Sequence, residues 1–337
     1  MVWNLQFQFA GFILMLLVAG MCLAQRRLNF AAERAFIKLL LAVTVSILFD
    51  ILSIFAINYR DTIGPVACEI VCKSYLFTIV VVACQSSLFS SAEIRHGFSR
   101  FLMNLTYLPL LAEVIVFALF PVKIHVSEGE LYTYGVPVMV TYGLCALYLV
   151  STLVMVIVLR HDINAKSRAS IYFWMICWLV AAGIQFLNNQ LLIVSFAMAL
   201  ACVYMYCKLE NPEYHLDFAT NVFNGKGFSV IMTENIKSRS SIAIISFVIT
   251  DAGRVIDIFG AKAIEAIVSD ISDFMDSIPG VTLFRLEDNL FCVAVESGER
   301  AETVLETVSK RFTIPWSVRD AQIEVNAAFS YIPDMSR

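Results

Sequence analysis

Charged residues are scarce in this chain. Only 15% of its 337 residues are Asp, Glu, Lys or Arg, and 59% are hydrophobic, whereas about a quarter of the residues in soluble domains are charged. A chain this apolar cannot be a soluble globule throughout, so part of it must contact lipid. It also lacks the basic excess of a nucleic-acid-binding protein, because residues 213–337 carry 11 Lys and Arg against 18 Asp and Glu.

The cysteines do not form the pattern of a disulfide framework. Most of the nine lie in apolar runs, where a thiol acts as a small hydrophobic side chain. Cys68 and Cys72 fall near the predicted outer face and could be redox-active or bind a metal, but no histidine ligand lies near them in the sequence. We therefore predict no metal site and no cofactor.

Seven apolar stretches fill the chain as far as residue 208, and each is close to the roughly 20 residues that a membrane span needs. The first has no basic residue before it and Arg26 and Arg27 just after it, which is the reverse of a cleavable signal peptide, so we expect it to remain as an anchor. Only Asn188 and Asn189 separate the last two stretches, and either a tight hairpin or a single broken span fits there. The seven stretches lie near residues 5–24, 36–57, 67–91, 101–121, 135–159, 169–187 and 190–208.

Basic residues alternate between the loops and predict the orientation of the spans. The loops after spans one, three and five should be cytoplasmic, because they hold Arg26, Arg27, Arg34 and Lys38, then Arg95 and Arg100, then Arg160, Lys166 and Arg168. The opposite loops carry acids beside their single basic residues. The expected topology is that of a bacterial inner-membrane protein with its N-terminus outside and its C-terminal domain in the cytoplasm.

Four ionisable residues lie inside the predicted spans, and all four fall in the outer part of the bilayer. They are Asp50, Glu69, Lys73 and Glu113. One interpretation is structural: Glu69 and Lys73 pair along one helical face, and the other two bond to neighbouring helices. The other interpretation is a polar pocket, open to the outside, that binds a small extracellular ligand or an ion. A conducting pathway would need matching polar groups in the inner halves of the spans.

The pattern changes after residue 208, and Pro212 discourages one continuous helix from the membrane into the tail. We expect a membrane region at 1–208, a short linker at 209–216 and a soluble α/β domain at 217–337. Its periodicity predicts a central, mainly antiparallel hairpin. The expected elements are helices near 221–237, 258–277 and 299–311, and strands at 242–250, 280–286, 290–296 and 323–332.

The residues of this tail resemble a known family. Asp217-Phe-Ala-Thr220, followed by Asn224 and Phe228, is similar to the opening D-x-L-T-x-x-x-N-R-x-x-F of GGDEF domains, the diguanylate cyclases. Asp257-Ile-Phe-Gly260 falls where that family has N-D-x-x-G-H. The segment from Arg285 to Phe291 falls where it has R-x-G-G-D-E-F. The resemblance extends over about 120 residues and implies the fold of a nucleotide cyclase.

The same alignment shows where the reactive residues differ. The resemblance implies metal-binding acids at Val248 and in the signature loop, but that loop reads Glu287-Asp288-Asn289-Leu290. Mg²⁺ prefers oxygen ligands, and acidic side chains in place of the two glycines put bulk and negative charge where phosphates would lie. We therefore predict a degenerate domain with no catalytic residues.

Two further positions bear on the nucleotide. The guanine-binding Asn of the family corresponds to Ile256, and its partner Asp to Glu265, the one remaining candidate for a nucleotide contact. The inhibitory R-x-x-D site is replaced by Asp276-Ser-Ile-Pro279. A catalytic acid pair at Glu287 and Asp288 is disfavoured, because adjacent acids in a turn are usually only solvated.

The family normally has a further helix and strand where this sequence stops at Arg337, so we expect a longer protein or a trimmed domain. The resemblance implies a cyclic-di-GMP signalling protein whose membrane bundle is a sensor. Its implied partners are a second copy and an EAL phosphodiesterase domain, in the same or another chain. Two alternatives stay open: a weakly active diguanylate cyclase, and a transporter or channel with a regulatory tail.

Overall fold

The computed structural model divides into two compact units, which we describe separately. The first comprises residues 1–25 and 31–211, and the second comprises residues 26–30 and 212–337. Arg95 and Asn189, used above for the topology, lie outside the described residues. The structure describes residues 5–28, 30–94, 100–127, 130–188, 191–210, 212–217, 219–238, 241–296, 298–318 and 321–333.

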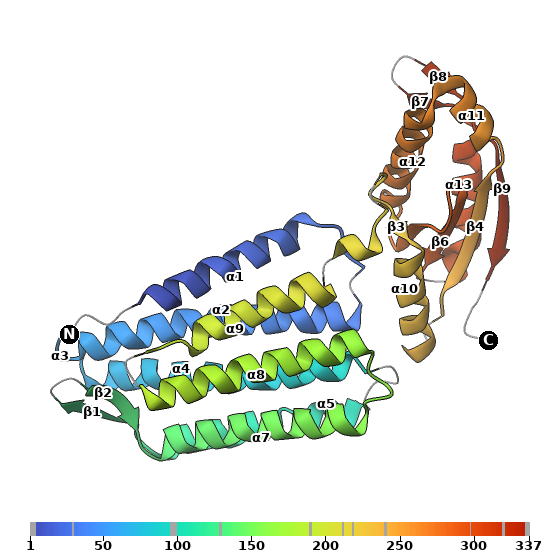
Figure 1. Ribbon diagram of the computed structural model, residues 1–337. Helices are drawn as coiled ribbons and strands as arrows, with labels where there is room; N and C mark the ends of the chain where they lie inside the picture. Colours follow the sequence, from blue (N-terminus) through green and yellow to red (C-terminus); the bar gives the residue numbers. More distant parts are fainter. Residues whose placement is uncertain are drawn as a thin grey trace. The chain divides into compact units, whose positions relative to one another are not determined.

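The first unit is a helical bundle with a small β-hairpin at one end (Figure 1). Five of its described helices, α1, α2, α4, α7 and α8, are long and apolar enough to cross a membrane. The elements are α1 Gln6–Ala24, α2 Ala31–Asn58, α3 Arg60–Ile63, α4 Pro65–Ala92, α5 Arg100–Leu105, α6 Leu108–Leu119, β1 Lys123–Ser127, β2 Glu130–Tyr134, α7 Val136–Val158, α8 Ala165–Leu187 and α9 Val194–Met205, which continues as a π-helical turn at Tyr206–Glu210.

Two of the seven predicted spans correspond to shorter apolar helices, at Met103–Leu119 and Val194–Leu209. The first of these is interrupted between α5 and α6. Pro109 lacks the N–H that would continue the helix, and the carbonyl of Thr106 accepts a 2.6 Å hydrogen bond from the Tyr148 hydroxyl of α7. A neighbouring helix thus helps to satisfy the backbone where this helix breaks.

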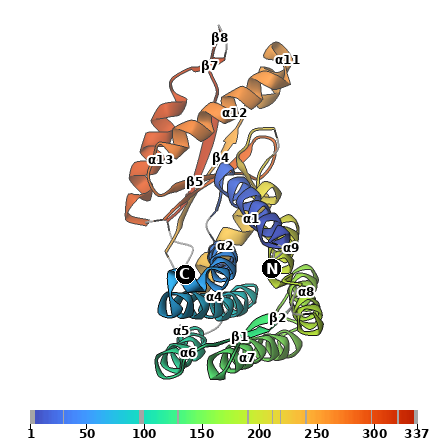
Figure 2. The same ribbon diagram turned by 90° about the vertical axis from the view of Figure 1, so that its left-hand side faces the viewer.

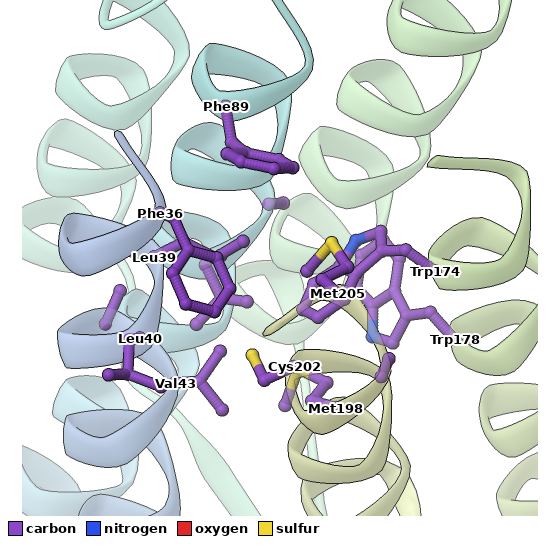
Figure 3. Close-up of a cluster of buried hydrophobic side chains, with 14 of the residues drawn as sticks. Phe36, Leu39, Leu40, Val43, Phe89, Trp174, Trp178, Met198, Cys202 and Met205 are labelled. Carbon is purple, nitrogen blue, oxygen red and sulfur yellow. The ribbon is translucent and has the colours of Figure 1, made fainter. Parts of the chain in front are cut away.

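The core of the bundle is formed by large side chains from several helices. Figure 3 shows Phe36 of α2, Phe89 of α4, Trp174 of α8 and Met205 of α9 meeting in one cluster. The ring centres of Phe36 and Phe89 lie 5.9 Å apart. Because lipid tails are as apolar as these side chains, close packing rather than exclusion of water must hold helices together within a bilayer.

The second unit is an α/β domain with a mixed five-stranded sheet in the order β3-β5-β6-β4-β9. Strands β5 and β6 form the antiparallel hairpin expected at its centre, β4 pairs antiparallel with β6 and β9, and β3 pairs parallel with β5. The elements are β3 Phe223–Asn224, α10 Gly225–Ser238, β4 Ala243–Ile249, α11 Ala252–Phe259, α12 Ala261–Asp276, β5 Val281–Arg285, β6 Leu290–Val295, α13 Gly298–Phe312, β7 Trp316–Val318, β8 Ala321–Ile323 and β9 Ala327–Ile332.

Alternate residues of the strands pack against helices on opposite faces of the sheet. Ile245, Phe247 and Ile249 of β4 belong to the large core cluster that also contains residues of α12 and α13, and Figure 2 shows these two helices lying across the strands. Ile244 faces the other way and packs in a smaller cluster with Met232 of α10. This period of two is the expected consequence of burying both faces of a strand.

The structure has more elements than the periodicity predicted. The helix expected near 258–277 is present as α12, but an unpredicted short helix, α11, precedes it. Gly260, whose φ of 83° favours glycine, ends α11 and separates the two. The last predicted strand, 323–332, is shared between β8 and β9. The hairpin of β1 and β2 was expected only as a loop.

Candidate functional site

The first residue of the opening motif, Asp217, ties the start of the domain to the central hairpin. Its Oδ1 accepts hydrogen bonds from the backbone N–H (3.1 Å) and hydroxyl (2.7 Å) of Thr220. The Nη1 of Arg285, at the end of β5, donates a third at 3.1 Å. Partial burial alone would raise the pKa of the Asp217 carboxyl, but the bonds from Thr220 and the charge of Arg285 outweigh it and hold that pKa below its usual range.

The asparagine of the same motif has a structural role as well. Asn224 precedes α10, and its Oδ1 accepts from the backbone N–H groups of Lys226 (2.9 Å) and Gly227 (3.1 Å). Its Nδ2 donates to the carbonyls of Tyr214 and Leu216. This is the chemistry of a helix N-cap, so Asn224 fixes the start of α10 against the segment that precedes it.

The signature loop is a short turn between β5 and β6. Leu286 donates a backbone hydrogen bond of 2.9 Å to the carbonyl of Leu290, which closes the turn. Glu287 is exposed, and the Asp288 side chain points fully into solvent. The carbonyl of Asp288 accepts from Arg285 at 3.0 Å. The turn is thus closed by its own backbone and by Arg285, with both acids outside.

Two of the positions at which the resemblance implies metal ligands lie opposite each other in the sheet. Val248 of β4 is the Cα partner of Leu290 at the start of β6. Directly opposed residues of an antiparallel pair project their side chains from the same face. Two half-buried aliphatic side chains therefore stand side by side at positions where the resemblance implies carboxylates.

Beside this pair, two hydrogen bonds join the end of β4 to the signature loop. Ile249 donates a 2.9 Å hydrogen bond to the carbonyl of Asn289, and Asn289 returns a longer one of 3.4 Å from its Nδ2 to the carbonyl of Ile249. Asn289 is thereby engaged with β4. Within the described residues, there is no group of three or more His, Cys, Asp or Glu side chains that could hold a metal ion.

The positions implied to bind the nucleobase lie on α11 and α12. Ile256 is 42% exposed, so an apolar side chain is presented where the family has an amide. Glu265 lies on the second turn of α12 and is half-buried. Its contact with a nucleotide stays a prediction.

The ionisable residues of the bundle fall into three groups. In the first, Lys73 and Glu69 form an ion pair of 2.7 Å one helical turn apart on α4. Lys73 also donates to the carbonyl of Phe117 at 2.7 Å. Glu69 accepts from the backbone N–H of Val122 at 3.2 Å. This group therefore holds α4 against the end of α6 and the segment that follows it.

The second group surrounds Asp50, which is buried on α2. Its Oδ2 accepts from the hydroxyl of Ser195 of α9 at 2.5 Å and from the Nε2 of Gln8 of α1 at 3.3 Å. The same Nε2 donates to the carbonyl of Leu192 at 2.9 Å. Three helices are therefore joined at one carboxylate.

The third group is Glu113 of α6, which is fully buried. Its Oε1 accepts from the hydroxyl of Thr141 of α7 at 2.8 Å. Its Oε2 has no hydrogen-bond partner within the described part of the chain. The contacts of the four residues thus join different pairs of elements, and a pocket shared by all four stays a prediction. Cys68 and Cys72 are also buried, in a small apolar cluster beside this region.

One functional candidate was missed by the sequence analysis, namely the segment 26–30. It connects α1 to α2 and yet belongs to the second unit. Arg26 forms an ion pair with Asp276 at the end of α12 and donates a 2.8 Å bond to the Ser272 hydroxyl. Its guanidinium lies 5.2 Å from the ring centre of Phe223, a cation–π distance.

Opposing influences act on the pKa of Asp276, the acid of this pair. Burial raises the pKa of the Asp276 carboxyl, the charge of Arg26 opposes that rise, and nearby Asp273 adds to it, with a net increase. In the sequence, Arg26 was visible only as a basic residue after a span. No local pattern indicates a partner 250 positions away.

Comparison with known proteins gave matches in structure only. No family model matches the sequence, and no curated protein does. The GGDEF domain of FimX from Pseudomonas aeruginosa matches with a TM-score of 0.32 and 13% identity, over 35% of this chain and 78% of its own. The GGDEF domain of DgcB from Caulobacter crescentus, in complex with c-di-GMP, matches with a TM-score of 0.30 and 17% identity, over 35% and 74%.

A third match covers more of the chain. Diguanylate cyclase SiaD from Pseudomonas aeruginosa, in complex with its activator SiaC, matches with a TM-score of 0.33 and 17% identity, over 57% of this chain and 77% of its own.

Proposed function

We propose that this chain is a bacterial membrane signalling protein whose seven-span bundle is the sensor and whose degenerate GGDEF-like domain relays the signal without making cyclic di-GMP. The observation that carries the proposal is the pairing of Val248 with Leu290. Both stand where the motif resemblance implies carboxylates. Two facing aliphatic side chains cannot replace the water shell of Mg²⁺, which is a hard cation.

The signature loop adds a second obstacle to GTP. The glycines of the family allow a backbone to approach phosphates closely, whereas Glu287 and Asp288 extend two exposed carboxylates from the same turn. Like charges repel, so these acids disfavour a triphosphate. Arg285, 4.0 Å from the Asp288 carboxylate, offsets only part of that repulsion because it also pairs with Asp217. Residual nucleotide binding would depend on Glu265 alone.

The covalent path for a signal has two entries into the second unit. One is the connection after α9, near Pro212, and the other is the segment 26–30, which leaves α1 and returns to α2. A displacement of α1 relative to α2 would move Arg26, which lies just after α1, and would therefore strain its ion pair with Asp276. We propose that this segment, and not only the final span, couples the bundle to the domain.

The input and output are proposed from the same resemblance. The input is a small extracellular ligand or ion at the outer polar pocket of Asp50, Glu69, Lys73 and Glu113. The output is a change in packing or pairing, either in a homodimer or against an EAL-type phosphodiesterase domain or partner. The protein would lie in the inner membrane with its N-terminus outside.

Binding of Mn²⁺ in the presence of GTP tests this function. For the purified full chain, the paramagnetic resonance signal of free Mn²⁺ should be unchanged by added protein. The double variant Val248→Asp/Leu290→Glu should lower that signal saturably, because it supplies two facing carboxylates. The matched control, Val248→Asn/Leu290→Gln, has similar shapes without the charge and should behave like the native chain. Saturable binding by the native chain that is lost in Glu287→Ala would refute the proposal.

A further inference from the structure

A cavity lies at the end of the bundle opposite the β-hairpin, where α7 passes into α8. It has a volume of about 490 Å³ and is lined by Ile157, Arg160, His161, Arg168 and Tyr172. The volume is within the range of sites that hold a small organic molecule rather than a lone ion. None of these residues belongs to the signature loop or to the outer polar groups.

The lining is cationic on one side. Arg168 donates a 2.6 Å bond from its Nη1 to the carbonyl of Arg160. The Nε of Arg160 donates to the Nε2 of His161 at 3.3 Å. Each guanidinium carries five N–H donors, and these bonds use one on each, so both retain donors for an anion. Between residues 157 and 172 there are three Lys or Arg residues and one acid, Asp162.

The other side of the cavity is apolar. Ile157 is 53% exposed on the last turns of α7, and Tyr172 of α8 is half-buried with an amphipathic ring that suits a membrane interface. Exposed aliphatic residues continue from this point along α7, among them Val154 and Val150. An anion that entered alone would leave this apolar wall unused.

We propose that the cavity binds the glycerophosphate headgroup of an anionic phospholipid, with Arg160 and Arg168 on the phosphate and an acyl chain along Ile157. Arginine forks match phosphate oxygens, and basic cavities at the cytoplasmic ends of membrane helices suit such headgroups. The site fits the loop that basic residues predict to be cytoplasmic. This inference rests on the proposed membrane placement of the bundle and assigns a ligand that the proposed signalling function does not require.

Retention of lipid by the purified full chain tests the site. The chain is reconstituted in nanodiscs of phosphatidylcholine alone or with phosphatidylglycerol and is then returned to mild detergent. Native mass spectrometry measures which lipids remain bound to it. Reconstitution in phosphatidylcholine tests the membrane placement by itself, so its failure is distinguishable from failure of the headgroup site. The native chain should retain phosphatidylglycerol in preference to phosphatidylcholine.

Three variants locate the binding. Arg160→Gln and Arg168→Gln should each reduce retained phosphatidylglycerol by about tenfold or more, the effect of losing a charge-assisted pair. Lys38→Gln removes the same charge from an exposed position on α2, on the same predicted side of the membrane, and should retain the lipid fully. If Arg168→Gln fails to fold, Arg160→Gln on an exposed residue still decides the matter.

Three results would overturn the proposal. Equal retention of both lipids would mean that no headgroup is selected. Loss in Lys38→Gln as large as in Arg160→Gln would mean that only net charge matters. Displacement of the lipid by soluble glycerol phosphate at an equal concentration would assign the cavity to a free anion instead.

Discussion

Arg285 donates a 3.1 Å hydrogen bond from its Nη1 to Asp217, a residue 68 positions earlier in the chain. Its Nη2 donates a second hydrogen bond to the carbonyl of Asp288. The side chain of Arg285 is only 13% exposed. One guanidinium therefore fixes both the entry to the domain and the signature turn. The turn keeps a defined shape although its own residues differ from those of a cyclase.

This ion pair should contribute measurably to stability. In a double-mutant cycle with Asp217→Asn and Arg285→Met, we expect a coupling energy of about 1–2 kcal/mol at neutral pH, from urea unfolding of the second unit in the detergent-solubilised chain. The control is the exposed pair Lys310–Glu306, for which the same cycle should give a clearly smaller coupling, because water screens the two charges. Equal couplings for the two pairs would show that Arg285 has no special role.

The pH dependence of that coupling has a definite sign. The pKa of Asp217 is lowered in the folded state, so the stabilisation is fully present above the unfolded value of about 4 and is lost as the pH falls through the lower folded value. A coupling that grew on acidification would contradict the assignment.

Elements with strong periodicity were predicted from the sequence to within a few residues. The strands β4, β5 and β6 and the helix α13 fall where alternation or helical spacing placed them. Burial of one face of a strand or helix makes apolar residues recur at a regular spacing in the sequence. The resemblance to GGDEF domains likewise came from short motifs, whose order and spacing can be read without a structure.

Features that depend on distant contacts were not predicted. Nothing local marks Gly260 as a break between two helices rather than a residue within one, since the deciding quantity is its φ of 83°. The segment 26–30 joins the second unit through Arg26 and Asp276, whose partnership exists only in three dimensions. The pairing of Val248 with Leu290 required the strand register. Seven spans and the domain limits of 1–208 and 217–337 stay predictions.

The Arg26–Asp276 pair should hold segment 26–30 on α12. Arg26→Ala should speed amide hydrogen exchange in the last turn of α12 by about tenfold, as expected for losing a charge-assisted bond of about 1.4 kcal/mol. The reversed pair, Arg26→Asp with Asp276→Arg, should restore most of the protection. Lys38→Ala is the control and should leave exchange in α12 unchanged. Identical exchange in all variants would remove this segment from the coupling path.

Two variants test whether the outer polar residues bind a ligand or only stabilise the helical bundle. Asp50→Asn and Glu113→Gln keep the shape of each side chain and remove its charge. If these residues bind a cationic or hydrogen-bonding ligand, both variants should lose the ligand response while thermal stability changes little. The amide introduced by Asp50→Asn keeps an oxygen that can accept from Ser195, which limits the structural loss. Intact signalling with lowered stability would end the pocket hypothesis.

Topology can be checked with reporters placed according to the charge pattern. A reporter fused after Arg337 should be cytoplasmic, and one inserted between β1 and β2 should be external, because the basic loops lie on the opposite side from that hairpin. The independent check is Thr307→Cys, at an exposed position on α13. Labelling of that thiol in intact cells by a membrane-impermeant reagent would reverse the orientation.

Synthesis of cyclic di-GMP by the purified full chain tests the proposed inactivity of the domain most directly. With GTP and either Mg²⁺ or Mn²⁺, at protein concentrations high enough for two copies to associate, we expect no product, because Val248 and Leu290 face each other at positions where the resemblance implies metal-binding carboxylates. Product that forms with the native chain and disappears in Glu287→Ala or Glu265→Ala would refute the proposed inactivity and make this domain a diguanylate cyclase.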